Sequence, residues 1–257
     1  METIQTIPYP ILTMVIFLFG LVVGSFANVC IHRLPRKESV VLPRSHCPAC
    51  YSTIHILDNI PIISYIVLSG KCRDCDIRIS PIYPAIEIVT AVLLMAGFFK
   101  FGVSFEFFVY TVVAPLLVII TAVDIEHQII PDIITLPSIA LGLIAGIYTI
   151  GFVDSILGLL IGGGLFYLLA VLSNGGMGGG DIKYIAAAGA LLGWQKVLLV
   201  IFIGAFLGSI VGLFQIAVHK KSRKSMIPFG PFLATGTLIT LFYGNFLIRL
   251  YLEHLGS

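Results

Sequence analysis

Ser173-Asn-Gly-Gly-Met-Gly-Gly-Gly-Asp-Ile-Lys183 is the stretch around which the chain is organised, because it sets one ionisable carboxylate, Asp181, between two long apolar runs. Between Gly175 and Asp181 every residue except Met177 is glycine. Glycine lets the backbone approach a bound chain closely and adopt a positive φ at little steric cost. An acid among membrane segments predicts a functional site. The alternative is that Asp181 only caps the helix that follows.

The composition outside this stretch is that of a polytopic membrane protein. Of 257 residues, 58% are hydrophobic and 11% are charged, and the mean hydropathy is +1.05. A soluble domain has roughly 25% charged residues. The first apolar run, Ile11 to Ile31, is as long as a spanning helix needs and no Lys or Arg precedes it, so we expect it to remain as a membrane helix and not to be a cleaved signal peptide. The net charge is only +2, which does not predict nucleic-acid binding.

Apolar runs predict eight helices and therefore an all-α membrane fold of about eight transmembrane helices. The sixth run has only about twelve residues, or roughly 18 Å of helix, against a hydrocarbon core of about 30 Å. Glycines four residues apart, as in Gly20-x-x-x-Gly24, Gly158-x-x-x-Gly162 and Gly204-x-x-x-Gly208-x-x-x-Gly212, predict close helix packing. The predicted helices are residues 9–31, 82–99, 107–123, 133–150, 153–172, 182–193, 196–218 and 231–250.

Two basic clusters predict the orientation. Residues Arg33 to Arg78 contain seven of the fifteen Lys and Arg residues, and His219 to Lys224 forms the second cluster. Positive charge favours the cytoplasmic side, so eight crossings would leave both termini outside. The same map places the segment Asp124 to Pro131 and the glycine-rich stretch with Asp181 on the cytoplasmic face. The two acids are then expected at one depth.

The segment 32–80 carries a predicted metal site. It has under fifty residues, which is small for a hydrophobic core that folds alone. It contains Cys47-Pro-Ala-Cys50 and Cys72-Arg-Asp-Cys75, separated by 21 residues, and two such pairs are typical of a tetrahedral zinc site. Disulfides are the alternative, but a cytoplasmic location disfavours them. We therefore predict a small cytoplasmic, zinc-ribbon-like insertion.

The predicted zinc is architectural, because four thiolates fill its coordination shell and leave no position for a reacting water. His46 and His55 are alternative ligands, and Cys30, in the first helix, is expected to be a small buried apolar residue. On this reading the chain has three parts: a first transmembrane helix at 1–31, the four-cysteine insertion at 32–80, and a transmembrane bundle with the two acids at 81–257.

The partner expected for Asp181 lies in a polar interruption that follows the third helix and contains Asp124, Glu126 and Asp132. Asp132 follows a proline at the start of the next helix, where it is expected to cap free amides. Glu126 and the neighbouring His127 are expected to be solvated loop residues. Asp124 closes an apolar run and has no capping role there, because a helix C-terminus disfavours negative charge. Asp124 is therefore the natural partner.

Two facing carboxylates can share a proton, so that one acts as general base on a water and the other as general acid toward a leaving amine. This chemistry predicts peptide hydrolysis at the cytoplasmic rim of a helical bundle. Paired acids in membranes also serve as proton relays, so a proton-coupled transporter with a zinc-stabilised insert is an alternative. A scaffold that only binds its partner protein would need neither acid. The chain shows no convincing repeat of the kind that transporters often contain.

Taken together, the motifs resemble those of the type IV prepilin peptidases, membrane aspartic proteases of the Gly-x-Gly-Asp type, nearly from end to end. Any one of the motifs alone would be weak, but they follow the family's order. They are Gly24-Ser-Phe-Ala-Asn-Val-Cys-Ile-His-Arg-Leu-Pro35, the paired Cys-x-x-Cys motifs, Pro81-Ile-Tyr-Pro-Ala-Ile-Glu87, the stretch Asp124 to Asp132, and Met177-Gly-Gly-Gly-Asp-Ile-Lys183.

The resemblance implies a multi-pass protein of the bacterial cytoplasmic (inner) membrane, surrounded by lipid, that cuts basic leaders from prepilins or pseudopilins on the cytoplasmic side. Asp124 and Asp181 match the family's catalytic aspartates. Many members then methylate the new N-terminal amine with S-adenosylmethionine, and the four-cysteine insertion is typical of that bifunctional form. Glu87 matches a position linked with methylation, although an acid near a helix start is also favoured by the helix dipole. The sequence has no Rossmann-type glycine fingerprint, so methyl transfer rests on the resemblance.

Overall fold

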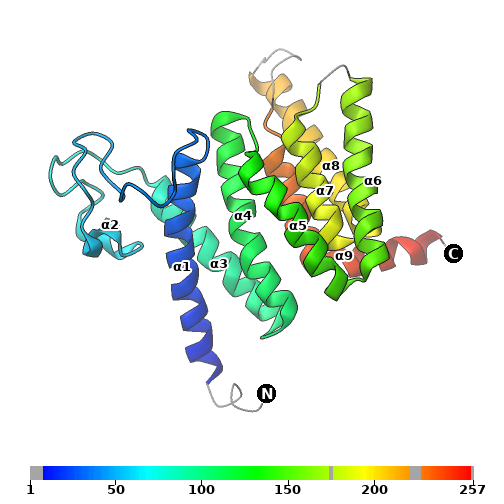
Figure 1. The fold of residues 1–257 in the computed structure, drawn as a ribbon, viewed down its shortest axis with the longest axis horizontal. Coiled ribbons are helices and arrows are strands. Elements are labelled where there is room, and N and C mark those ends of the chain that lie inside the picture. The colour runs from blue at the N-terminus through cyan, green and yellow to red at the C-terminus, as the bar shows by residue number, and fades with distance from the viewer. Residues whose placement is uncertain (1–7, 174–175, 220–226, 256–257) are drawn as a thin grey trace. The chain divides into compact units, whose positions relative to one another are not determined.

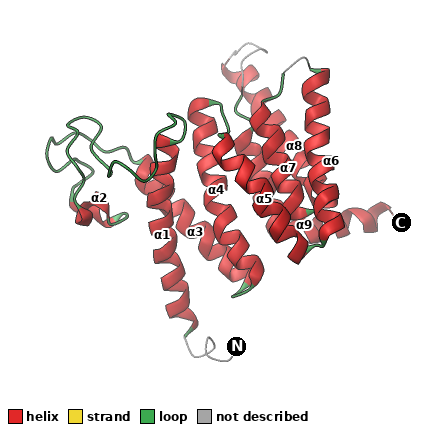
Figure 2. Cartoon of the chain, in the orientation of Figure 1, coloured by secondary structure: helices red, strands yellow, loops and turns green. Residues whose placement is uncertain are grey.

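The computed structural model describes residues 8–173, 176–219 and 227–255, and within these ranges it contains helices and loops but no strand (Figure 2). Each of the eight predicted apolar runs forms a helix, so the prediction of an all-α membrane fold is confirmed. The bounds of these helices are α1 Tyr9–Arg33, α3 Ile82–Phe101, α4 Phe105–His127, α5 Asp132–Thr149, α6 Phe152–Leu172, α7 Gly179–Leu192, α8 Trp194–His219 and α9 Gly230–Leu255.

Seven of these helices are long and apolar enough to cross a membrane. The exception is α7, the predicted short helix, which has 14 residues. It begins three residues before the predicted start, because Gly179 and Gly180 already belong to its first turn. Two further short helices, η2 Ile56–Asn59 and α2 Ile63–Val67, lie in the cysteine-rich insertion.

The chain forms two compact units, residues 1–119 and 120–257, and the boundary falls within α4. In the first unit α1 packs against α3 through its paired glycines. A Cβ atom at Gly20 would lie 2.5 Å from the Cα of Ala91, and one at Gly24 would lie 2.6 Å from the Cα of Glu87. Real Cβ atoms do not approach backbone so closely, so only glycine permits this contact. The close packing predicted from the first glycine pair is confirmed.

The second unit is built around α7, which is buried along almost its whole length from Tyr184 to Leu192. Glycines of its neighbours again bring backbones together. A Cβ at Gly142 of α5 would lie 2.7 Å from the carbonyl oxygen of Ala187, and one at Gly162 of α6 would lie 2.9 Å from that of Ile185. A short helix is tolerated here because neighbouring helices, not lipid, surround it. Figure 1 shows the α4–α5 connection, the start of α7 and the start of α9 at one end of this unit.

Candidate active site

Asp124 lies in the last turn of α4 and is buried, with 5% of its surface exposed. Its Oδ2 accepts a hydrogen bond of 2.7 Å from the backbone N–H of Gly230, the first residue of α9. That N–H has no partner within its own helix, and the N-terminal end of a helix attracts negative charge. Asp124 was expected to have no capping role at its own helix end, and the structure adds a role at the beginning of another helix. The C-terminal end of α4 disfavours the negative charge of Asp124, whereas the N-terminal end of α9 stabilises it.

Asp181 is half-buried in the first turn of α7. Its carboxylate lies over the backbone of Gly178, where a Cβ would be only 3.0 Å from Oδ2. We expected a glycine-rich loop, in which a positive φ would cost little, to present this acid. Instead Asp181 lies within the helix, and none of the described glycines at 176 and 178–180 has a positive φ. Asn174 and Gly175 lie outside the described residues.

Gly180 brings the start of α7 against the α4–α5 connection. A Cβ at Gly180 would lie 2.8 Å from the Cβ of Ile130 and 2.9 Å from its carbonyl oxygen. Ile130 itself is buried, six residues after Asp124. The glycine is needed for this backbone contact and not for an unusual φ. It sets the helix that carries Asp181 beside the segment that follows Asp124.

The two carboxylates interact through space. Burial raises the pKa of Asp181, which lies outside the seven candidate membrane spans, and the charge of Asp124 raises it further, to about 6, against a smaller opposing effect of the Gly178 backbone. A neighbouring like charge has this effect only at short range. The charge of Asp124 thus acts on Asp181, the acid that the sequence paired with it. Asp181 therefore holds its proton into the mildly acidic range.

Helix α9 bonds to Asp124 directly and to the helix of Asp181 through Tyr184, and the sequence did not indicate either contact. Besides the Gly230 contact with Asp124, its Thr237 accepts a buried hydrogen bond of 2.7 Å from the hydroxyl of Tyr184, one turn after Asp181. Thr237 in turn donates to a carbonyl of its own helix. The Gly-Pro pair at 230–231 predicts the start of a helix, and it was the one feature of the sequence that pointed to a free helix end here. Nothing in the sequence linked it to Asp124, 106 residues away.

The other charged or titratable residues on either side of the α4–α5 connection are exposed or partly exposed. Asp132 is the first residue of α5, but no side chain caps that helix, so its predicted capping hydrogen bond is wrong. Its Oδ1 instead accepts a hydrogen bond of 2.6 Å from Nζ of Lys183 on α7. Glu126 is exposed and His127 partly so, as expected, although both belong to the last turn of α4 and not to a loop.

Gly180 gives a testable consequence, because its neighbour Gly179 is a matched control. A Cβ at Gly179 meets no atom within 4 Å. Gly180→Ala should displace α7 from Ile130 and lower any activity that depends on Asp181 by about 10- to 100-fold, since small misplacements of catalytic groups have effects of that size. Gly179→Ala should retain activity close to that of the unchanged protein. Equal activities of the two purified variants would show that the Ile130 contact does not position Asp181.

The four-cysteine insertion contains two loops with the same hydrogen-bond pattern. In the first, the N–H of Tyr51 bonds to the carbonyl of Cys47 and the N–H of Cys47 bonds to the carbonyl of Ser52. In the second, Asp76, Cys72 and Ile77 repeat these bonds at the equivalent positions. Tyr51 and Asp76 both have positive φ, of 60° and 54°. Each Cys-x-x-Cys pair therefore lies in a tight turn that directs both thiols to one point.

The four thiol sulfurs lie within 4.8 Å of one another, and those of Cys47 and Cys75 are 3.8 Å apart. Sulfurs bound tetrahedrally at about 2.3 Å from zinc would lie roughly 3.8 Å apart, so the cluster fits such an ion. All described cysteines are free thiols, which is the arrangement that a metal needs. His46 and His55 do not belong to the cluster, and Cys30 is buried in α1 as expected.

Glu87 lies in the first unit, on α3, and is buried with 8% of its surface exposed. Its Oε2 accepts a hydrogen bond of 2.8 Å from the backbone N–H of Ile62 in the insertion. Ile62 has a φ of 61°, which is unfavourable for a β-branched residue and indicates local strain. The carboxylate therefore holds the insertion against α3.

Comparisons with known proteins agree with this architecture. The Bacterial Peptidase A24 N-terminal domain matches residues 18–101, and the Type IV leader peptidase family matches residues 111–213. Three similar proteins, each named prepilin leader peptidase/N-methyltransferase, come from Bacillus subtilis, Legionella pneumophila and Pseudomonas aeruginosa. They are 35%, 34% and 33% identical to this chain, over 93%, 96% and 93% of its length and 97%, 97% and 93% of theirs. No solved structure matches. This chain belongs to the family of type IV prepilin leader peptidases.

Proposed function

We propose that this protein uses Asp124 and Asp181 to cleave the basic leader from type IV prepilins or pseudopilins. The observation that supports this most directly is the pair itself: two carboxylates, one buried and one half-buried, at one end of a helical unit and close enough for one charge to raise the pKa of the other. The names of the relatives supply the substrate class.

The two acids have different environments, which suggests different roles. Oδ2 of Asp124 accepts the N–H of Gly230 at the start of α9, which fixes the orientation of this carboxylate. Burial and the charge of Asp124 raise the pKa of Asp181 to about 6. In the proposed mechanism Asp124 takes a proton from the attacking water while Asp181 donates one to the leaving amine. The products are the leader with a new carboxylate and the mature protein with a new N-terminal amine.

The direct test is incubation of the purified protein with a prepilin in detergent, followed by mass measurement of both products. A mass loss equal to the leader, with cleavage ahead of the hydrophobic segment, is expected. An intact prepilin under conditions where a known relative cuts it would contradict the proposal. Such a result would favour the alternative of a proton-coupled transporter, which predicts proton flux in liposomes and no cleavage.

Cleavage should depend on pH with an alkaline limit set by Asp181. Its pKa is raised to about 6, so the proton needed by the leaving amine is present below that pH and is lost as the pH rises through it. At low pH the second proton binds and removes the general base, so kcat/KM should show a bell shape. The measurement is kcat/KM between pH 4 and 9 in detergent. A flat profile over this range would exclude a dyad that shares one proton.

We also propose that the dyad faces the cytoplasm of a bacterium, from its inner membrane. Seven candidate spans and the family support a multi-pass inner-membrane protein. The orientation rests on the basic residues of the insertion and of the segment from His219 to Lys224, most of which lies outside the described residues. A reporter fused after Lys224 tests it, and an external reading would place the dyad on the wrong side for a cytoplasmic leader.

The second proposed activity is N-methylation of the new amine, for which the relatives are named. S-adenosylmethionine, the proposed donor, supplies an electrophilic methyl group when bound. Because Oε2 of Glu87 already binds the Ile62 amide, a positioning role for Glu87 fits better than a role as cofactor ligand. We propose that Glu87 keeps the insertion in place for methyl transfer, while zinc bound by Cys47, Cys50, Cys72 and Cys75 keeps it folded.

Glu87 variants can test this positioning role. Glu87→Gln retains an oxygen that can accept the Ile62 N–H, whereas Glu87→Ala leaves that amide without its partner. The methylation rate should therefore be retained in Glu87→Gln and should fall by about tenfold in Glu87→Ala. A tenfold loss corresponds to roughly the free energy of one hydrogen bond to a charged group. Cleavage should stay near normal in both. Equal loss of methylation in the two variants would instead indicate that the negative charge itself is required.

A further inference from the structure

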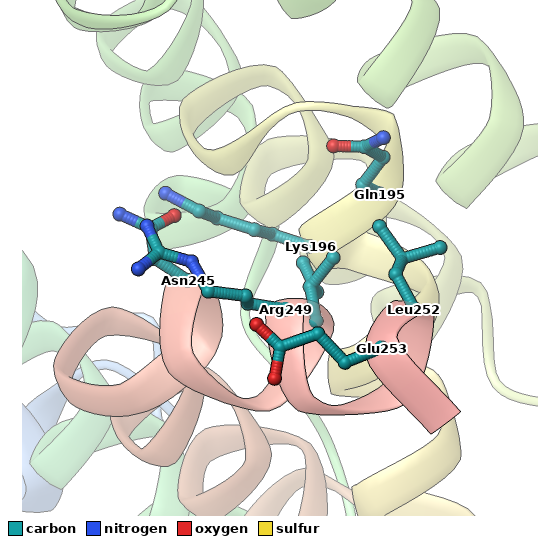
Figure 3. A pocket seen from close by; sticks show the side chains of 7 residues that line it. Gln195, Lys196, Asn245, Arg249, Leu252 and Glu253 are labelled. Atoms are coloured by element: carbon teal, nitrogen blue, oxygen red, sulfur yellow. The ribbon is translucent and has the colours of Figure 1, made fainter. Parts of the chain in front are cut away.

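The end of the second unit opposite the dyad contains a cavity of about 490 Å³ between the first turn of α8 and the last turns of α9. Figure 3 shows the ends of the Lys196, Asn245 and Arg249 side chains gathered on one side of it. Nothing in the proposed peptidase or methyl-transfer chemistry uses these groups. The lining residues are Gln195, Lys196, Asn245, Ile248, Arg249, Leu252 and Glu253.

The side chain of Lys196 lines the cavity and lies against α9. The side chain is only partly exposed, and its stem lies along α9 at Gly244, where a Cβ would be 3.6 Å from Cγ and 3.7 Å from Cδ. Neither Lys196 nor Arg249 forms an ion pair with any residue in the described ranges. Glu253 is the only acid of the lining, so the cavity retains a net positive charge.

The depth of the cavity points to the headgroup layer of a bilayer. At the opposite end of α9, its first residue Gly230 is bonded to Asp124. Arg249 lies nineteen residues after Gly230 in the same helix. At 1.5 Å per residue this is about 28 Å, close to the thickness of the hydrocarbon core of roughly 30 Å. Trp194 and Tyr251 are exposed at the same end, where aromatic residues favour the membrane–water interface.

We propose that this cavity binds the phosphate group of an anionic phospholipid in the leaflet opposite the dyad. Lys196 and Arg249 would contact the phosphate, and the amide of Asn245 can donate to its oxygens. Ile248 and Leu252 provide apolar lining for the glycerol and the first methylenes of the acyl chains, which a soluble phosphate would not need. The site would anchor the ends of α8 and α9 independently of the peptidase reaction.

The test is native mass spectrometry of the full-length protein in detergent with phosphatidylglycerol, phosphatidylethanolamine or inorganic phosphate. The unchanged protein should retain phosphatidylglycerol in preference to phosphatidylethanolamine. Lys196→Gln and Arg249→Gln should each weaken this binding by about fivefold, which corresponds to about 1 kcal/mol per cation near an anionic headgroup. Glu253→Gln should strengthen it. Lys100→Gln, which removes a charge from the end of α3 and outside this cavity, should leave it unchanged.

Three results would overturn the proposal. Equal retention of the two lipids would show that binding does not depend on the net charge of the headgroup. Unchanged phosphatidylglycerol binding in both cation variants would place the lipid elsewhere. Inorganic phosphate that competes at the same concentration as the lipid would make this a site for a soluble anion. Elution of each variant as a single species, as for the unchanged protein, guards against loss of binding through misfolding.

Discussion

Asp124→Asn and Asp181→Asn are each expected to lower prepilin cleavage by about 10²- to 10⁴-fold, the usual contribution of one general acid or base. Asparagine has nearly the same shape but can neither accept the proton of the water nor donate one as a carboxylic acid. Its amide oxygen can still accept the N–H of Gly230, so the α4–α9 contact should survive the change at position 124. Cleavage by the purified variants, measured by mass, decides this.

Asp132→Asn is the matched control, because it removes a carboxylate from the same connection. That carboxylate is exposed and forms a surface ion pair with Lys183, and such pairs contribute roughly 0–1 kcal/mol. Cleavage by this variant should stay within a few-fold of normal. If either Asp124→Asn or Asp181→Asn retained substantial turnover, the dyad would be wrong. Loss in Asp132→Asn alone would identify a different partner for Asp181.

Replacing any one of the four clustered cysteines by serine should abolish most zinc binding and unfold the insertion. The insertion has few buried residues of its own, and structural zinc supplies about 10–16 kcal/mol to domains of this kind. The purified variants should contain much less zinc and should be cut by protease within residues 32–80. Methylation should fall more than cleavage, because the dyad lies in the other unit.

Cys30→Ser is the control for this prediction, since Cys30 is buried in α1 and does not belong to the cluster. It should keep one zinc per chain. Full zinc content in all four single variants of the cluster would show that these cysteines do not bind the zinc. Removal of zinc by a chelator should reproduce the effect of the cysteine variants without any change of sequence.

The sequence predicted the helices well because membrane helices need long apolar runs, and those runs are explicit. The cysteine cluster was equally accessible, since the spacing within each Cys-x-x-Cys pair already constrains both thiols. The paired acids could be inferred because the alternation of helices places Asp124 and Asp181 at one end. The division into parts at residues 31 and 80 stays a prediction.

The failures concern contacts between segments that are distant in the sequence. Asp132 was expected to cap its own helix, but Lys183, 51 residues later, binds it. Gly180 was expected to provide backbone freedom, but the buried Ile130 requires its lack of a side chain. The support of Asp124 by Gly230 could not be predicted, because any free helix start could have received that carboxylate. Local chemistry is readable from sequence, whereas the choice among equivalent partners depends on packing.

The most direct test of the central claim is a comparison of the double variant Asp124→Asn/Asp181→Asn with the two single variants in the same cleavage assay. Residues that act as one unit have non-additive effects, because removing the first already abolishes the shared step. The dyad predicts that the double variant retains about the same residual rate as the slower single variant. A double variant slower by the product of the two single effects would mean that the acids act independently, and would contradict the account.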